Sequence, residues 1–322
     1  MVWLAIGLHT VTVVTTAVEQ ARIRDELLPA GFGLIAVPWW DSSAMAAAAT
    51  EALDASADQL AADGHPGFGV DLEHELVCAR LSLSLAEQEE LRLLGADASQ
   101  AVEDALRAWE PGAADAAISA CIAQQLELAG ADAPILLVGA DERLRRFRHP
   151  VTRGERTIST VMAVLVARRH GLHVALTRFV ASELAPRLER DLAAVAQIHR
   201  YALTHARPGN TYGDLYAALE HGYSAAGFEG AWAGHYQGGP IGYAQREFEL
   251  APCQTESRWW ATSITEGMAL ALNPSLPGGA KDEDTFVITA AGPQLITTTL
   301  SWPAVDQCDP PRPAVLRYGG GR

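Results

Sequence analysis

"EPGAADAAISACIAQQLELAG" (Glu110–Gly130) and "RPGNTYGDLYAALEHGYSAAG" (Arg207–Gly227) are two versions of one pattern, and this pattern decides the fold. Each follows a long amphipathic helix pattern, breaks at Pro-Gly, continues as a second helix and stops at a glycine. In both copies the stopping glycine comes 18 positions after the Pro-Gly glycine (112 to 130 and 209 to 227). The repeat predicts two similar halves around a pseudo-two-fold axis, with a site between them.

Strand patterns follow each helix pair. The long first helices are predicted over 82–109 and 189–206, and Ser82 is the expected cap of the former. Apolar and β-branched runs predict strands at 133–140, 161–169, 173–181, 267–274 and 285–297. Residues 81–322 are therefore expected to form one α+β domain, in which helices lie on a curved antiparallel sheet.

Residues 1–80 show a different order, in which strands and helices alternate. A β-branched run at 9–16 predicts a strand, 18–28 a helix and 32–40 another strand. The first eighteen residues are apolar, but they lack Lys and Arg, and His9 and threonines interrupt them, so a strand is favoured over a signal peptide. This stretch is predicted to be a small α/β domain.

The composition excludes some classes of partner. The chain has 322 residues, with 24 Lys and Arg against 39 Asp and Glu, for a net charge of −15. Such an acidic surface disfavours nucleic acid and favours solubility, or more weakly cationic ligands. No apolar run is long enough for a membrane span. No pair of the four cysteines has C-x-x-C spacing, which indicates free thiols in a reducing cytoplasm: Cys78, Cys121, Cys253 and Cys308.

Four stretches resemble motifs of the pita-bread family, which includes methionine aminopeptidase, aminopeptidase P, prolidase and creatinase. They are "RFRHPVTRGERTIST" (146–160), "VLVARRHGLHVALTR" (164–178), "GHYQGGPIGYAQREF" (234–248) and "MALALNPSLPGGAKDEDTFVIT" (268–289). The resemblance covers roughly residues 82–305. It implies the pita-bread fold, and residues 1–80 resemble a shortened form of the N-terminal domain in the creatinase and prolidase branch.

The resemblance also implies where metal ions would bind. Peptidases of the family hold two ions with Asp, Asp, His, Glu and Glu, and these ligands fall here on Val164, Ala175, His235, Asn273 and Glu283. Only the histidine and the last glutamate are kept. Two neighbouring divalent ions need several carboxylates to bridge them and to neutralise their charge. We therefore expect no metal ion and no other cofactor.

Creatinase, a metal-free member of the family, suggests what the remaining groups do. The resemblance implies acid–base catalysis by His235, with Glu283 and with His149 as the substrate-site histidine. The alternative for His235 is a hydrogen-bonded core histidine. An ion pair with a neighbouring carboxylate is an equally good interpretation of Arg246, and the tyrosines are more easily explained by packing. The expected substrate-binding residues are Arg246, Glu247, Asn273, Tyr236 and Tyr243.

Three functions remain open from the sequence. The favoured one is a metal-independent, creatinase-like hydrolase or lyase that acts on a small polar, amino-acid-like or guanidino substrate. The second is a non-catalytic relative that binds a ligand or partner, and the third is an aminopeptidase P-like metallopeptidase with replacement ligands. The resemblance implies a homodimer. We expect a cytoplasmic protein without nucleic-acid or membrane partners.

Overall fold

The computed structural model describes residues 2–63, 67–252, 259–299, 301–305 and 310–319. The chain divides into two compact units, Met1–Ala79 and Arg80–Arg322, which are described separately. The described cysteines, Cys78 and Cys121, are free thiols, whereas Cys253 and Cys308 lie outside the described residues. None of the described helices is long and apolar enough to cross a membrane.

The first unit is built on a three-stranded sheet. Strand β1 (Val2–Ile6) pairs antiparallel with β2 (Val11–Thr16), and β2 pairs parallel with β3 (Gly33–Val37). Helix α2 (Ala44–Leu53) packs its alanine-rich side on this sheet. The smaller elements are α1 (Gln20–Arg22), η1 (Ile23–Leu27), η2 (Ala57–Gln59), β4 (Ala61–Ala62), β5 (Val70–Asp71) and the first residues of α3 (Glu73–Leu81). The strand expected over 9–16 is confirmed.

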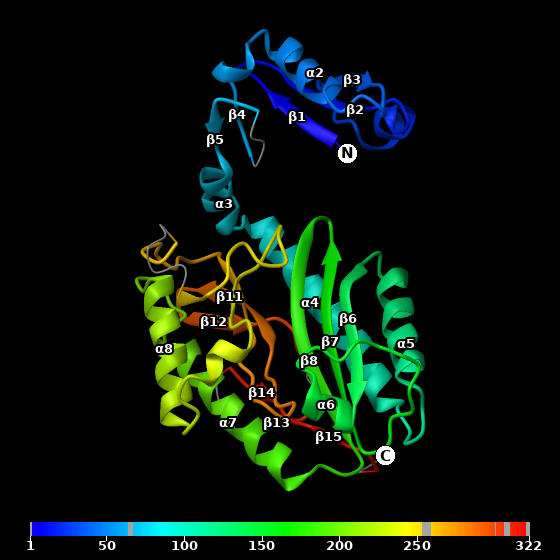
Figure 1. Cartoon of the computed structure of the whole chain (residues 1–322), viewed down its shortest axis with the longest axis vertical. Helices are drawn as coiled ribbons and strands as arrows, with labels where there is room; N and C mark the ends of the chain where they lie inside the picture. Colours follow the sequence, from blue (N-terminus) through cyan, green and yellow to red (C-terminus); the bar gives the residue numbers. More distant parts are fainter. Residues whose placement is uncertain (1, 64–66, 253–258, 300, 306–309, 320–322) are drawn as a thin grey trace. The chain divides into compact units, whose positions relative to one another are not determined.

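The larger unit contains two helix–helix–sheet halves (Figure 1). The first half consists of α4 (Leu85–Arg107), α5 (Asp115–Leu128), β6 (Asp132–Ala140), α6 (Glu142–Arg146), β7 (Thr160–Arg169) and β8 (Leu172–Ala181). The second consists of α7 (Pro186–Leu203), α8 (Tyr212–Ala225), η3 (Ala231–Gly234), β9 (Gly238–Pro240), β10 (Ala269–Leu272), β11 (Asp284–Thr289) and β12 (Gly292–Leu295). Three short strands follow: β13 (Ala304–Val305), β14 (Arg312–Pro313) and β15 (Leu316–Arg317).

The two Pro-Gly corners have the same geometry, as the sequence repeat predicted. Gly112 has φ +97° and Gly209 has φ +96°, a region that glycine enters without strain. The Gly112 N–H donates to the Thr157 carbonyl over 2.6 Å, and the Gly209 N–H donates to the Ile264 carbonyl over 3.3 Å. Each corner is thus tied to a later segment of its own half. The prediction of two similar halves is confirmed.

The curved sheet consists of two four-stranded sheets that meet at β8 and β11. Their strand orders are β15-β8-β7-β6 and β12-β11-β10-β9. The Thr177 N–H donates to the Glu283 carbonyl over 3.0 Å, and the Ala175 N–H donates to Thr285 Oγ1 over 2.8 Å. The fully buried Arg178 guanidinium joins the same strands through Asp284, 3.0 Å away. The halves are therefore linked through the two motifs that carry Thr177 and Glu283.

Helix α4 begins two residues later than the sequence suggested. Its cap is Ser84, not Ser82. The Ser84 N–H donates to Glu87 Oε2 over 2.7 Å, and the Glu87 N–H donates to Ser84 Oγ over 3.3 Å. This reciprocal capping box satisfies two backbone donors at the helix start. Ser82 instead makes a backbone bridge with Met268.

Replacing Ser84 with Ala is expected to lower the free energy of unfolding of the larger unit by about 1 kcal/mol, because an N-cap acceptor is lost. Ser82→Ala is the matched control, since Ser82 is exposed too, and it should change stability by less than about 0.5 kcal/mol. Urea unfolding followed by circular dichroism measures both. Equal losses in the two variants would contradict the assignment of the cap.

Candidate functional site

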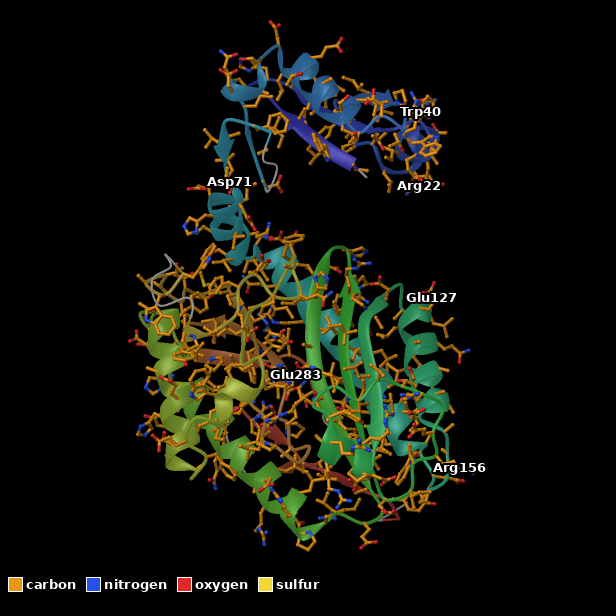
Figure 2. All side chains as sticks on the ribbon, in the orientation of Figure 1. Arg22, Trp40, Asp71, Glu127, Arg156 and Glu283 are labelled. Atoms are coloured by element: carbon orange, nitrogen blue, oxygen red, sulfur yellow. The ribbon has the colours of Figure 1, made fainter. Side chains whose placement is uncertain are left out.

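Glu283 lies at the centre of the candidate site, immediately before β11, and is marked in the middle of the larger unit in Figure 2. Its carboxylate accepts a hydrogen bond of 2.7 Å from Thr177 Oγ1 and lies 3.1 Å from the Lys281 ammonium nitrogen. Both side chains of this ion pair are 4% exposed. Burial alone would raise the pKa of Glu283, but Lys281 and Thr177 outweigh it and hold that pKa below its ordinary value.

Lys281 is a residue of the candidate site that sequence reasoning missed, although the sequence contains a signal. It is the only lysine in the chain, and every other cationic residue among the 24 Lys and Arg is an arginine. Lysine carries a compact point charge on a flexible stem, whereas arginine presents a broad planar fork. A single lysine two residues before the motif glutamate therefore marks a place where a compact buried cation is used.

His235 and His149 form a hydrogen-bonded pair beside this ion pair. Their Nε2 atoms are 3.1 Å apart, and His235 Nδ1 is 2.5 Å from the Tyr236 carbonyl oxygen. A carbonyl only accepts hydrogen bonds, so His235 carries its proton on Nδ1. When both rings are neutral, His149 Nε2–H then donates to His235 Nε2 and leaves a lone pair on His149 Nδ1. His149 is the more exposed ring of the two.

The protein keeps this histidine pair neutral. Burial, followed by the charge of the Lys281 ammonium, lowers the pKa of His235 to about 4, and the neighbouring Glu283 offsets only part of this shift. The pKa of His149 is also lowered, first by partial burial of the ring, which disfavours its charged form, and then by the charges of Lys281 and Arg148. Both rings are therefore uncharged at neutral pH, and a ring nitrogen lone pair is available.

The positions that match the family's metal ligands do not form a metal site. Val164 belongs to an apolar cluster with Leu144, Met162 and Phe179. Ala175 has no side-chain donor, and Asn273 Oδ1 is buried without a hydrogen-bond partner among the described residues. Within the described parts of the chain, no three His, Cys, Asp or Glu side chains come together as a metal site requires. The donor set does not fit a pair of divalent ions, because Glu283 is already paired with Lys281.

The expected substrate-binding residues have other partners. Arg246 lies 3.1 Å from Glu249 and donates to the Ala271 carbonyl over 2.7 Å, so the ion-pair interpretation describes its position. The Glu247 carboxylate pairs with Arg80 over 2.7 Å. The Tyr243 hydroxyl donates to Glu87 over 2.5 Å. Tyr236 is 66% exposed; its carbonyl accepts from His235 Nδ1, and its ring lies edge-on to the His235 ring, with 6.2 Å between the ring centroids. The structure brings together His149, His235 and the Lys281–Glu283 pair, with the Tyr236 ring against His235 and the Arg246 charge acting on Glu283. Glu247 and Tyr243 are paired with Arg80 and Glu87 instead.

The glycines of the 234–248 stretch allow close backbone packing under the site. A Cβ at Gly238, which has φ +105°, would lie 2.2 Å from the Ala271 carbonyl oxygen. One at Gly239 would lie 2.3 Å from the Phe248 carbonyl oxygen. Only glycine permits strand β9, which the sequence did not predict, to pack this closely between β10 and the following loop.

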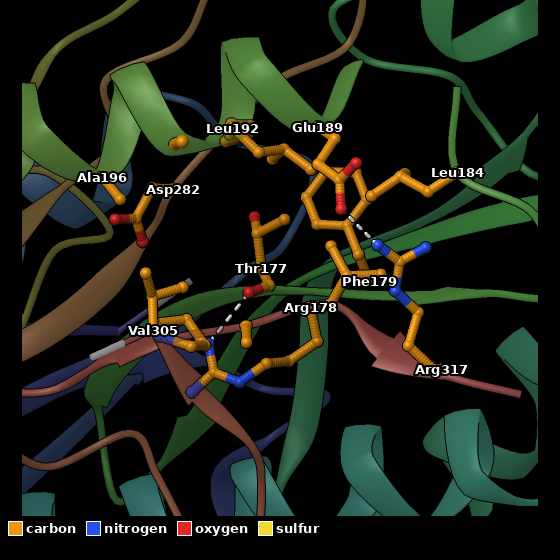
Figure 3. A pocket seen from close by; sticks show the side chains of 15 residues that line it. Thr177, Arg178, Phe179, Leu184, Glu189, Leu192, Ala196, Asp282, Val305 and Arg317 are labelled. Atoms are coloured by element: carbon orange, nitrogen blue, oxygen red, sulfur yellow. Dashed lines mark hydrogen bonds and ion pairs between the residues drawn. The ribbon is translucent and has the colours of Figure 1, made fainter. Parts of the chain in front are cut away.

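A cavity of about 300 Å³ is lined by Lys281 of the Glu283 ion pair. Figure 3 shows the cavity with Thr177, Glu189 and Arg317 labelled. Thr177 and Lys281, which both contact Glu283, are part of its wall. The rest of the wall is mostly apolar and comes from β8, from α7 and from the C-terminal segment around Val305 and Val315, with Asp282 beside Lys281. An ion pair between Glu189 and Arg317, 2.5 Å apart, lies at this cavity and joins the two walls.

Residues 89–290 match metallopeptidase family M24. The structure is similar to dipeptidase PepE from Mycobacterium ulcerans (TM-score 0.70, 21% identity, 90% of this chain and 82% of that chain). It is also similar to the prolidase from Pyrococcus horikoshii OT3 (0.73, 15%, 90% and 85%). A third similar structure is the N-terminal domain of FACT complex subunit SPT16 from Cicer arietinum, chickpea (0.64, 13%, 90% and 82%). At these identities the likeness shows the pita-bread fold alone. No curated protein matches the chain in sequence.

The histidine pair gives a direct test of the local charges. In a Lys281→Met/Glu283→Gln double variant, the pKa of His235 is expected to rise above about 4 but to stay below 6.5, because the ammonium is lost while burial remains. NMR titration of the ring carbons measures this. The control is the exposed pair Arg168 and Asp132, for which Arg168→Met/Asp132→Asn should leave the His235 titration unchanged. An unchanged His235 pKa in the first variant would contradict the role given to Lys281.

Proposed function

Since this chain belongs to metallopeptidase family M24, we propose that it uses the family's fold without the family's metal ions, as a hydrolase or lyase of a small polar, amino-acid-like substrate. The observation that supports this proposal is the buried Lys281–Glu283 ion pair. It places a protein cation against the one glutamate that remains from the metal-ligand set. A divalent ion at Glu283 would have to displace or neutralise that ammonium in a site where both side chains are 4% exposed.

In this proposal, the histidine pair carries out the proton transfers. For a hydrolysis, the lone pair on His149 Nδ1 takes a proton from an attacking water, and the oxygen forms a bond to the reacting carbon. The C–N bond then breaks, and the same proton returns to the departing nitrogen. His235 fixes the tautomer of His149 through the 3.1 Å bond between the Nε2 atoms, while the Tyr236 carbonyl fixes that of His235. The pair is neutral before the reaction, as a proton acceptor must be.

The carboxylates favour an amino-acid-like substrate over a cationic guanidino group. Glu283 is neutralised by Lys281, and Glu247 by Arg80. A guanidinium would therefore compete with an existing cation at each of them. Arg246, Glu247, Tyr236 and Tyr243 have no place in the mechanism we propose.

A non-catalytic binding protein is the second candidate function. It is favoured by the contacts of Glu283 Oε2, which already accepts from Thr177 Oγ1 and pairs with Lys281, so that this oxygen is less available to orient a water. The third possibility, a metallopeptidase with replacement ligands, has no such support. A homodimer and a cytoplasmic location complete the proposal, and light scattering coupled to gel filtration tests the former.

Metal binding is expected to require the lost ligands. Elemental analysis of the wild-type protein after incubation with manganese, cobalt or zinc should give near-zero stoichiometry. A Val164→Asp/Ala175→Asp/Asn273→Glu/Lys281→Met variant restores three carboxylates and frees Glu283. Its melting temperature should rise with added manganese by several degrees, as binding to the folded state alone requires, and the wild type should not respond. About two ions per wild-type chain would overturn the proposal.

Catalysis is expected to survive chelation and to depend on His149. The substrates to screen in EDTA are dipeptides, including those of the prolidase type named among the similar structures, and N-acylated and guanidino amino acids. For any substrate that is turned over, His149→Ala should lower kcat by roughly a hundredfold or more. The exposed His170→Ala is the matched control. Failure of every substrate class in EDTA would favour the binding function instead.

A further inference from the structure

Arg148 is a half-buried cation beside the histidine pair, and no carboxylate faces it among the described residues. Its guanidinium carries five N–H donors. The one acceptor recorded for them within the described chain is Ser275 Oγ, 2.9 Å from Nη1. The other terminal nitrogen, Nη2, lies 3.2 Å from where a Cβ of Gly234 would be, directly before His235 in the chain. The side chain therefore lies next to the proposed reaction site with donors to spare.

The position of the Arg148 side chain is fixed by hydrogen bonds among its neighbours Ser275 and Tyr223. The Ser275 N–H donates to the Tyr223 hydroxyl over 2.8 Å, and that hydroxyl donates to the Ser275 carbonyl over 3.1 Å. Tyr223 is fully buried, and burial raises its pKa to about 12, so it stays a neutral donor. Ser275 thus holds one edge of the guanidinium at a rigid point. An anchored arginine loses little side-chain freedom when it binds a ligand.

The local charge is positive although the chain is acidic. The charged groups that act on His149 are Lys281, Glu283 and Arg148. Lys281 and Glu283 cancel, and the Arg148 charge remains. Exposed charges farther from the site than the screening length of about 8 Å at physiological salt act on it only weakly. The charge that a ligand meets beside the histidine pair is therefore set by Arg148 and not by the acidic surface of the chain.

We propose that Arg148 binds a carboxylate of the ligand beside the His149–His235 pair, and that the chain selects small molecules that carry one. Carboxylates match the planar guanidinium fork with two parallel hydrogen bonds. The ligand would thereby supply the counter-charge that the described protein does not provide. This inference rests on the proposed function only in placing the ligand at the histidine pair.

The test compares two probes of nearly the same shape, N-acetylglycine and N-acetylglycinamide, which differ in a carboxylate and a neutral amide. Calorimetry on EDTA-treated protein measures their binding without any turnover. Wild-type protein is expected to bind the acid at least about tenfold more tightly than the amide, as a charged hydrogen-bonded pair implies. Arg148→Met should abolish this preference, and Arg148→Lys should keep only part of it.

Arg146→Met is the matched control. It removes the same charge two residues away, from an exposed side chain that stacks on Phe147, and it should keep the wild-type preference. Circular dichroism confirms that each variant is folded. Wild-type protein that binds neither probe at millimolar concentration, or binds both equally, would overturn the inference, and so would an Arg148→Met variant that keeps the preference. Bound manganese together with an intact Arg148-dependent preference would reject the metal-free function but not this inference.

Discussion

The contact between Thr177 and Glu283 is the interaction on which the arrangement of the larger unit depends. It consists of a backbone hydrogen bond of 3.0 Å and a side-chain bond of 2.7 Å between β8 and the start of β11. The adjacent residues repeat the connection, because Arg178 pairs with Asp284 between the same two segments. The sheets of the two halves therefore meet where polar motif residues meet. A change at this point affects both the fold and the site.

Such a junction places charge in the interior, and the charges are balanced there. Arg178 and Arg312 are fully buried, and Arg312 lies against Asp282 and Asp284. A buried ion that loses its partner costs about 3–5 kcal/mol, whereas a complete pair is close to neutral for stability. Glu283 follows the same rule with Lys281. In our proposal, the Lys281 ammonium takes the place at Glu283 that the resemblance gives to metal ions, and Val164 and Ala175 then need no carboxylate.

Much of the fold could be predicted because the sequence signals for its elements involve residues that are close together in the chain. The Pro-Gly corners, the helix patterns and most strands each depend on neighbouring residues. The cap of α4 was expected at Ser82, the strand expected over 285–297 is the hairpin of β11 and β12, and the glycine-rich strand β9 was not predicted. The site was harder to predict. His149 and His235 were named as site residues through motifs, and the structure pairs them, but the partners of Glu247 and Arg246 were not predicted. Arg80 and Glu247 are 167 positions apart, and no local pattern encodes such a pair. For Lys281 the sequence offered only one signal, that it is the single lysine of the chain.

That single lysine also provides the most direct test of whether Lys281 takes the place of metal. Protein grown with lysine labelled at 13Cε gives one side-chain resonance, from Lys281. Adding cobalt(II), a paramagnetic ion, would shift or broaden that resonance if the ion bound at Glu283, only 3.1 Å from the ammonium. Our account predicts an unchanged resonance through a several-fold excess of cobalt. A saturable paramagnetic shift at stoichiometric cobalt would show that metal enters the site, and would contradict the account at its centre.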